Sequence, residues 1–194
     1  MKILVLDTET TGLPPKGPLC TETWPHVVQC SFIAVDTDSN KHTEYDYIVA
    51  VKVDLGDSTK IHGITPSLNR ERGMSFPDVY AILKVCLDTC DMVVGHNLSF
   101  DLNMIRVECL RHSLDYQDPE LPYCTMKGTK GLCNLLGPSG FVKYPKLQEL
   151  YVKLFGCEAK HLHNALADCY ACLCCFYRVV LKRDPPSKFR KNLT

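Results

Sequence analysis

The stretch that decides the fold is residues 1–13, MKILVLDTETTGL, at the start of the 194-residue chain. The apolar run ILVL at positions 3–6 predicts a short strand that is buried on both faces. Because side chains alternate along a strand, Asp7 and Glu9, which follow this run, can point the same way. Two such carboxylates repel each other without a cation, and Mg²⁺ prefers oxygen ligands. The stretch therefore predicts a central strand that ends in a metal site.

Length and charge limit the number of domains and the kind of partner. A chain of 194 residues suits one domain with a sizeable core. We expect this domain at 1–182, followed by a short basic tail at 183–194 that is mobile. The 22 Lys and Arg residues equal the 22 Asp and Glu residues. No overall field therefore attracts polyanions, and any contact with nucleic acid must be local.

Twelve cysteines are the unusual feature of the composition. The apolar run at positions 3–6 is too short for a signal peptide, and no stretch is long enough to span a bilayer. We therefore expect a cytoplasmic protein with reduced thiols and no membrane partner. Cys169 and Cys172 have the Cys-x-x-Cys spacing of zinc ligands, but no second ligand pair accompanies them. Packing of these thiols in the core is the favoured interpretation, and zinc is the alternative.

The remainder of the chain alternates strand and helix signals, which indicates a mixed α/β domain. A loop rich in Pro, Gly and Thr is expected at 14–24, and a short helix after IHGITP at 61–66. The strands are expected at 27–35, 42–51, 91–95 and 123–126, with a turn at 36–40. The longer helices are expected at 76–90, after the segment 96–101 up to about 112, at 130–136, at 145–155 and at 164–181.

Four acids and one histidine stand where these elements begin or end. Asp7 and Glu9 end the first strand, Asp101 follows the strand 91–95, and His163 precedes Asp168 by five residues. The segments that carry them are LDTETTGL (6–13), GHNLSFD (95–101) and HNALAD (163–168). In this order they resemble the DEDDh subgroup of DnaQ-like 3′-to-5′ exonucleases, with lesser matches at WPHVVQ (24–29) and IHGIT (61–65). The resemblance covers residues 1–180 and implies an RNase H-like fold, a five-stranded mixed sheet flanked by helices.

The resemblance also implies the roles of these residues. Asp7, Glu9, Asp101 and Asp168 would hold two Mg²⁺ ions, for which Mn²⁺ can substitute. Such a pair, about 4 Å apart, activates the attacking water and stabilises the leaving oxygen of a phosphodiester. His163 would take the proton from that water, because an imidazole titrates near neutrality. His161, two residues earlier, is the alternative base, although the spacing His-x-Ala-x-x-Asp selects His163.

Residues for the substrate follow from the resemblance alone. The backbone at Thr10 and the side chain of Leu13 would hold the 3′-terminal nucleotide, and Phe100 would stack on a base. His62 and Asn97 are further candidates. Leu13 could instead anchor the loop in the core and Phe100 could be a core residue, whereas His96 is expected to be structural.

The function expected is a metal-dependent 3′-to-5′ exonuclease that releases nucleoside 5′-monophosphates from the 3′ ends of single-stranded DNA. The alternative substrate is RNA or short oligoribonucleotides, because no motif reports on the sugar. A catalytically silent module that binds nucleic acid or a protein partner is the alternative of another class. The carboxylate cluster argues against it, since it would repel the ligand without metal. For a role in DNA repair or proofreading, a stand-alone enzyme is the favoured interpretation, with a polymerase partner and a homodimer as alternatives.

Overall fold

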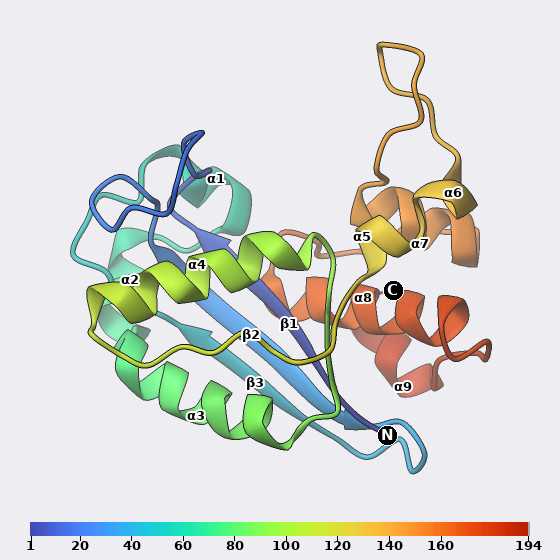
Figure 1. The fold of residues 1–194 in the computed structure, drawn as a ribbon, viewed down its shortest axis with the longest axis horizontal. Coiled ribbons are helices and arrows are strands. Elements are labelled where there is room, and N and C mark those ends of the chain that lie inside the picture. The colour runs from blue at the N-terminus through green and yellow to red at the C-terminus, as the bar shows by residue number, and fades with distance from the viewer. Residues whose placement is uncertain (194) are drawn as a thin grey trace.

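The structure, a computed structural model, describes residues 1–193 (Figure 1). Its centre is a five-stranded sheet with the strand order β3-β2-β1-β4-β5. β1 pairs antiparallel with β2 and parallel with β4, β2 pairs antiparallel with β3, and β4 pairs parallel with β5. The mixed sheet that the sequence predicted is therefore confirmed. The strands are β1 (Lys2–Thr10), β2 (Val27–Asp36), β3 (His42–Ile48), β4 (Met92–Gly95) and β5 (Pro122–Cys124).

The alternation of side chains along β1 divides the core into two layers. Ile3 and Val5 pack in one cluster with residues of the helix α8 (Ala165–Val179). Leu4 and Leu6 pack in the other cluster, with α3 (Phe76–Thr89) and α4 (Leu98–Arg111). The central strand is thus covered on both faces, as a continuous apolar run predicts.

Shorter helices complete the described chain. Ser75 caps α3 by accepting a hydrogen bond from the backbone N–H of Asp78. The remaining helices are η1 (Gly56–Ser58), α1 (Thr59–His62), α2 (Pro66–Arg72), α5 (Thr125–Gly128), α6 (Lys130–Cys133), α7 (Leu147–Phe155), α9 (Ser187–Arg190) and η2 (Lys191–Leu193).

Four strands end at the same edge of the sheet, which we call the carboxyl edge. β1, β4 and β5 run parallel, and β3 shares their direction because it is antiparallel to β2. The chain therefore leaves β3 at one side of this edge, into η1, α1 and α2, and leaves β5 at the other side, into α5 and α6. Residues 134–145, which we call the arm, follow α6 and project from the domain (Figure 1).

Several predicted elements end earlier than expected. β3 ends at Ile48 and not at 51, since Val49 forms an isolated parallel bridge with Met74. β5 ends at Cys124 because Thr125 begins α5. α6 stops at Cys133, where Asn134 takes a left-handed backbone conformation. α7 begins at Leu147, so Pro145 precedes the helix and does not form its first turn.

The segment 183–194, expected to be a mobile tail, differs in the part that the structure describes. Phe189 and Leu193 are fully buried in the same cluster as α8. The Phe189 ring lies 5.1 Å from His42 and 5.7 Å from Tyr177, measured between ring centroids. Burial of these two apolar side chains, which stand among many cations in the sequence, stabilises the packing of the segment against the domain.

The thiols of α8 lie in the core, as favoured from the sequence. Cys169, Cys172, Cys174 and Cys175 are buried and free. Within residues 1–193, no group of three metal-ligating side chains includes them. None of the helices in the described part of the chain has the length and apolar character needed to cross a membrane.

Candidate active site

Three carboxylates meet at the carboxyl edge. Ligand oxygens of Asp7, Glu9 and Asp168 all lie within 4.8 Å of one another. Asp7 and Glu9 are odd-numbered residues of β1, so they face the side of the sheet that α8 covers, as do Ile3 and Val5. Asp168 lies in the first turn of α8. Alternation in the strand and the position of α8 together bring this trio together.

Asp101 approaches the trio from the opposite face. It lies in the first turn of α4, and only 2% of its surface is exposed. The Thr8 backbone N–H and hydroxyl both donate to its Oδ1, at 3.0 and 2.8 Å. Thr8 is an even-numbered residue between Asp7 and Glu9, so it points to the α4 side. This role of Thr8 was not predicted from the sequence, although the same alternation of side chains places it on the α4 side.

The start of α8 is fixed by polar contacts to the sheet. Asn164 caps the helix by accepting a hydrogen bond from the Ala167 backbone N–H at 3.2 Å. Gln29 of β2 accepts one from the Ala165 N–H at 3.3 Å and donates to Asp46 at 2.7 Å. Gln29 is 4% exposed and pairs with Glu9 across the strands. It was also missed from the sequence, where a single glutamine in the apolar run VVQCSFIAV is the signal.

Burial raises the pKa of every acid in the site, and the charges of neighbouring acids raise it further for Asp7, Glu9 and Asp101. The pKa of Glu9 rises to about 8, first through burial and then through the charges of Asp168 and Asp101. Burial raises the pKa of Asp101 to about 7 against the lowering effect of the Thr8 hydrogen bonds. Burial also raises the pKa of Asp168 to about 7. The pKa of Asp7 is raised well above its usual range by burial and then by Asp101, Asp168 and Glu9.

The donor set suits divalent cations. In the described residues no Lys, Arg or His forms an ion pair with Asp7, Glu9, Asp101 or Asp168. Four acids packed without a positive partner are unstable as anions, and the raised pKa values express that cost. Oxygen ligands of this kind are those that Mg²⁺ and Mn²⁺ prefer. These residues therefore fit one or two such ions.

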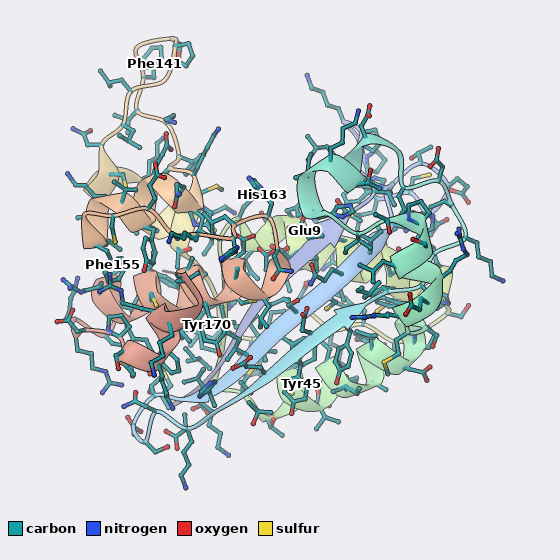
Figure 2. The ribbon with its side chains drawn as sticks, turned by 180° about the vertical axis from the view of Figure 1, so that it is seen from behind. Glu9, Tyr45, Phe141, Phe155, His163 and Tyr170 are labelled. Atoms are coloured by element: carbon teal, nitrogen blue, oxygen red, sulfur yellow. The ribbon has the colours of Figure 1, made fainter. Side chains whose placement is uncertain are left out.

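His163 lies next to the trio. Its backbone N–H donates to Asp168 Oδ2 at 2.8 Å, and its own backbone is left-handed, with φ of 72°. Its side chain is exposed at the carboxyl edge, where Figure 2 shows it with Glu9. His161 is also exposed and left-handed, with φ of 63°, but has no such link to the acids. The choice of His163 as the base stays a prediction.

The residues predicted to hold substrate occupy different settings. Leu13 is 87% exposed, so it does not anchor its loop in the core. Thr10 is buried, with its hydroxyl donating to the Gly12 carbonyl at 2.7 Å. Asn97 is exposed at the start of α4, and Phe100 is half-buried against the core. The far end of the loop 14–24 is held by Arg111, which donates to the Thr21 carbonyl at 2.9 Å.

Two further histidines are engaged within the protein. His62 is 8% exposed, accepts a hydrogen bond from the Ile64 N–H through Nδ1 and contacts the Ser58 hydroxyl through Nε2, each at 3.0 Å. Burial lowers its pKa. No contact brings it to the acids, so its proposed substrate role gains no support from this geometry. His96 donates through Nε2 to the Pro145 carbonyl at 3.0 Å, in keeping with the structural role expected of it.

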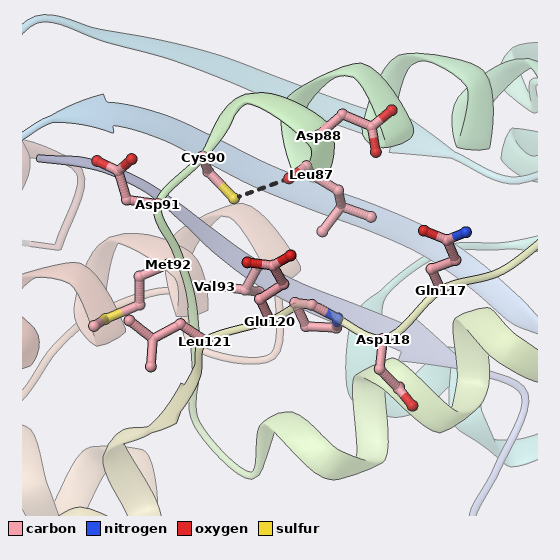
Figure 3. Close-up of a pocket in the computed structure, with 11 residues that line it drawn as sticks. Leu87, Asp88, Cys90, Asp91, Met92, Val93, Gln117, Asp118, Glu120 and Leu121 are labelled. Atoms are coloured by element: carbon pink, nitrogen blue, oxygen red, sulfur yellow. Dashed lines mark hydrogen bonds between the residues drawn. The ribbon is translucent and has the colours of Figure 1, made fainter.

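A separate pocket of about 480 Å³ lies elsewhere, between the end of α3 and the segment that leads into β5 (Figure 3). Its wall includes Asp91 and Met92, at the start of β4, and is therefore at the opposite end of the sheet from the carboxyl edge. Asp88 and Asp118 in this wall already pair with Lys84 and Arg106. The pocket is not part of the carboxylate site.

Fold and site together define an RNase H-like domain with an acidic centre at the ends of its strands. The family model of the exonuclease family RNase_T matches residues 4–176. The chain therefore belongs to the DnaQ-like exonuclease family.

Known proteins agree with this assignment. The chain is 27% identical over 198 residues to DNA polymerase III subunit epsilon of Buchnera aphidicola subsp. Schizaphis graminum (strain Sg), covering 99% of this chain and 79% of that protein. Exonuclease I from Methylocaldum szegediense is similar in structure, with a TM-score of 0.69, 19% identity and coverage of 94% of this chain and 41% of that one. Cell-death related nuclease 4 gives a TM-score of 0.70, 14% identity and coverage of 94% and 64%. A full-length 3′-exonuclease gives a TM-score of 0.70 and 14% identity, and the match covers 93% of this chain and 60% of that one. This chain thus spans less than two thirds of each of the three solved chains.

Proposed function

We propose that this protein is a metal-dependent 3′-to-5′ exonuclease that releases nucleoside 5′-monophosphates from single-stranded DNA ends. The observation that carries the proposal is the carboxylate trio of Asp7, Glu9 and Asp168, whose ligand oxygens lie within 4.8 Å of one another and form no ion pair with a cation in residues 1–193. Similarity to a 3′-exonuclease supports the direction, and similarity to a DNA polymerase subunit supports DNA as the substrate.

Each residue of the site has a proposed role in hydrolysis. Asp7, Glu9, Asp101 and Asp168 hold two Mg²⁺ or Mn²⁺ ions, which when bound activate water and stabilise the leaving oxygen. The exposed imidazole of His163 takes the proton from the attacking water. The water oxygen bonds to phosphorus, the bond to the 3′ oxygen breaks, and that oxygen takes a proton from solvent. The terminal nucleotide leaves with its 5′ phosphate.

Holding the substrate end is the proposed role of the loop after β1 and the start of α4. Thr10 offers its backbone, and the 87% exposed Leu13 can contact the terminal base. Asn97, which precedes Asp101 in the sequence, is exposed. Phe100 keeps part of its ring free for stacking. His62 stays among the candidates only as a residue that would first have to break its contacts with Ser58 and Ile64.

A time course on a denaturing gel tests the proposal. Single-stranded DNA and RNA of one sequence, each labelled at the 5′ end, are incubated with Mg²⁺, Mn²⁺ or EDTA. We expect a ladder that shortens from the 3′ end with either metal and stops in EDTA. The variant Asp168→Asn should give no ladder. Full activity in excess chelator would contradict metal dependence, and early release of the labelled 5′ nucleotide would contradict the direction.

RNA is the second candidate substrate, because discrimination of the sugar depends on packing around the 2′ position and no sequence motif reports on it. The ratio of the DNA and RNA rates in the same experiment decides between them. Absence of a ladder on both strands, with folded protein and metal present, would favour the silent binding module.

Partners and location follow as secondary proposals. The relative from Buchnera is by name a subunit of DNA polymerase III, so a polymerase is the partner to test by co-purification. Sedimentation measures whether the chain forms a homodimer. A reducing, cytoplasmic location would keep all twelve thiols free, as they are in the structure.

A further inference from the structure

The arm carries apolar side chains that the domain does not bury. Residues 134–145 form a hairpin in which Leu136 bridges Val142 and the Gly137 N–H donates to the Phe141 carbonyl at 2.9 Å. Phe141, which Figure 2 shows at the tip, is 79% exposed, and Leu136 and Tyr144 are 67% and 48% exposed. Exposed apolar groups gathered on a projecting segment mark a contact surface.

The same part of the chain is basic. Residues 121–148 contain four lysines and no acid, in a protein whose overall charge is zero. Lys127 and Lys146 are exposed, and Lys130 lies 4.8 Å from the centre of the Tyr144 ring. Within the described residues these three form no ion pair, whereas Lys143 pairs with Glu149 at 2.5 Å. The local positive charge is thus largely uncompensated.

The arm is also fixed beside the carboxylate site. Its base is held by His96, which comes directly after β4 and donates to the Pro145 carbonyl at 3.0 Å. The ring's other nitrogen contacts the hydroxyl of Thr125 at 2.9 Å, at the start of α5. Both contacts lie at the carboxyl edge, where β4 and β5 end. The base of the arm therefore lies at one side of the carboxyl edge, and α1 and α2 lie at the other side (Figure 2).

The two sides of the carboxyl edge differ in charge, and a polyanion favours the more positive side. Residues 49–75, which include α1 and α2, carry four Lys or Arg residues and three acids. The arm side combines two exposed aromatic rings, Phe141 and Tyr144, with the three lysines that form no ion pair among the described residues. Cations that follow a backbone and rings that stack on bases are the two features of surfaces that bind single strands.

We propose that the arm binds the nucleic-acid strand on the 5′ side of the scissile nucleotide, with Phe141 stacking on a base and Lys127, Lys130 and Lys146 facing phosphates. This inference rests on the proposed function, because it takes the strand's 3′ end to lie at the carboxylates. It predicts that the protein prefers strands long enough to reach the arm.

Two substrates of different length test the inference. One is the p-nitrophenyl ester of thymidine 5′-monophosphate, which is too short to reach the arm when it is bound at the carboxylates. The other is single-stranded DNA of about 20 nucleotides, beyond the roughly 4 to 16 that single-strand binding folds cover. Phe141→Ala should lower kcat/KM on the long strand by about fivefold or more, since stacking contributes that much. Hydrolysis of the ester should not change.

The lysines are tested by salt dependence. Lys127→Ala and Lys146→Ala should each reduce the slope of log affinity against log salt for the long strand by about 0.7. Leu110→Ala on α4 is the matched control for the exposed apolar side chain, as Leu110 is 56% exposed. Lys41→Ala in the turn before β3 is the control for charge. Both controls should behave like the wild type.

The outcomes separate this inference from the proposed function. If the wild type hydrolyses both substrates and Phe141→Ala is unchanged on the long strand, the arm is not a strand-binding surface. If the wild type hydrolyses neither, the proposed function fails, and equilibrium binding of the labelled strand in Ca²⁺ decides on the arm alone. Phe141→Ala that leaves strand binding intact but dissociates a dimer would assign the arm to self-association and overturn the inference.

Discussion

Replacing Thr8 by Val removes one hydrogen bond from a buried acid and almost nothing else. Val has the shape of Thr, so a methyl group takes the place of the hydroxyl that donates to Asp101 at 2.8 Å. The backbone N–H of residue 8 keeps its own bond to the same oxygen, at 3.0 Å. A hydrogen bond to a charged group contributes about 1.5 to 3 kcal/mol. Because Asp101 is 2% exposed, water cannot replace the lost donor.

That loss can be converted into a change in metal affinity. One pKa unit corresponds to about 1.36 kcal/mol. Losing about 1.5 kcal/mol of hydrogen-bond energy therefore raises the pKa of Asp101 from about 7 to about 8. At about pH 7 the ionised fraction of Asp101 then falls from about half to about a tenth. Since a cation must displace this proton, Mn²⁺ should bind about fivefold more weakly at pH 7. The difference in Mn²⁺ affinity should disappear at about pH 9, where Asp101 is ionised in both the wild type and Thr8→Val.

Isothermal titration of Mn²⁺ at several pH values measures this effect. Thr8→Ser keeps the hydroxyl and is the matched control, which should retain most of the wild-type affinity. Near-ultraviolet circular dichroism checks that each variant is folded. Equal affinity of Thr8→Val and the wild type at pH 7 would show that the Thr8 hydroxyl does not support metal binding, and a defect in Thr8→Ser as large as that of Thr8→Val would show the same.

Three further predictions concern pH, the base and the docked segment. Without metal, the raised pKa values of Glu9 and Asp168 make the folded state bind more protons than the unfolded state, so stability should fall as pH rises from about 5 to 8. Denaturation in EDTA measures this, and a rise instead would contradict the electrostatics. His163→Gln should lower kcat by about 10²- to 10⁴-fold with metal affinity retained. His161→Gln is its control, and a larger loss in that variant would reverse the assignment. Phe189→Ala should cost about 3 kcal/mol in urea unfolding, because the ring is fully buried. The exposed Phe141→Ala should cost little, and equal values for the two would show that the segment is not docked.

The sheet could be predicted because local patterns specify it. The apolar run before Asp7 and the hairpin at 27–51 are set by alternation and turn residues, which act over a few positions. The pairing of Asp7 with Glu9 follows from the same alternation. The order of strands and the presence of Asp101 and Asp168 at the same edge depend on long-range packing, which only the resemblance supplied.

Features that depend on packing between distant segments could not be predicted. Thr8 holds Asp101, 93 residues away, and Gln29 holds the start of α8, 136 residues away. Phe189 looked like one apolar residue in a basic tail, and only the space beside Tyr177 and His42 gives it a partner. β3 is shorter than expected for a similar reason, because Val49 pairs with the distant Met74 where the strand was expected to continue.

We propose that acids from β1, α4 and α8 form one site for catalytic metals. Electron paramagnetic resonance, with a nucleoside 5′-monophosphate present, measures how many Mn²⁺ ions each chain binds. We expect about two ions per chain in the wild type and the loss of at least one in both Asp101→Asn and Asp168→Asn. Unchanged Mn²⁺ binding in these variants would show that the acids do not share a metal site.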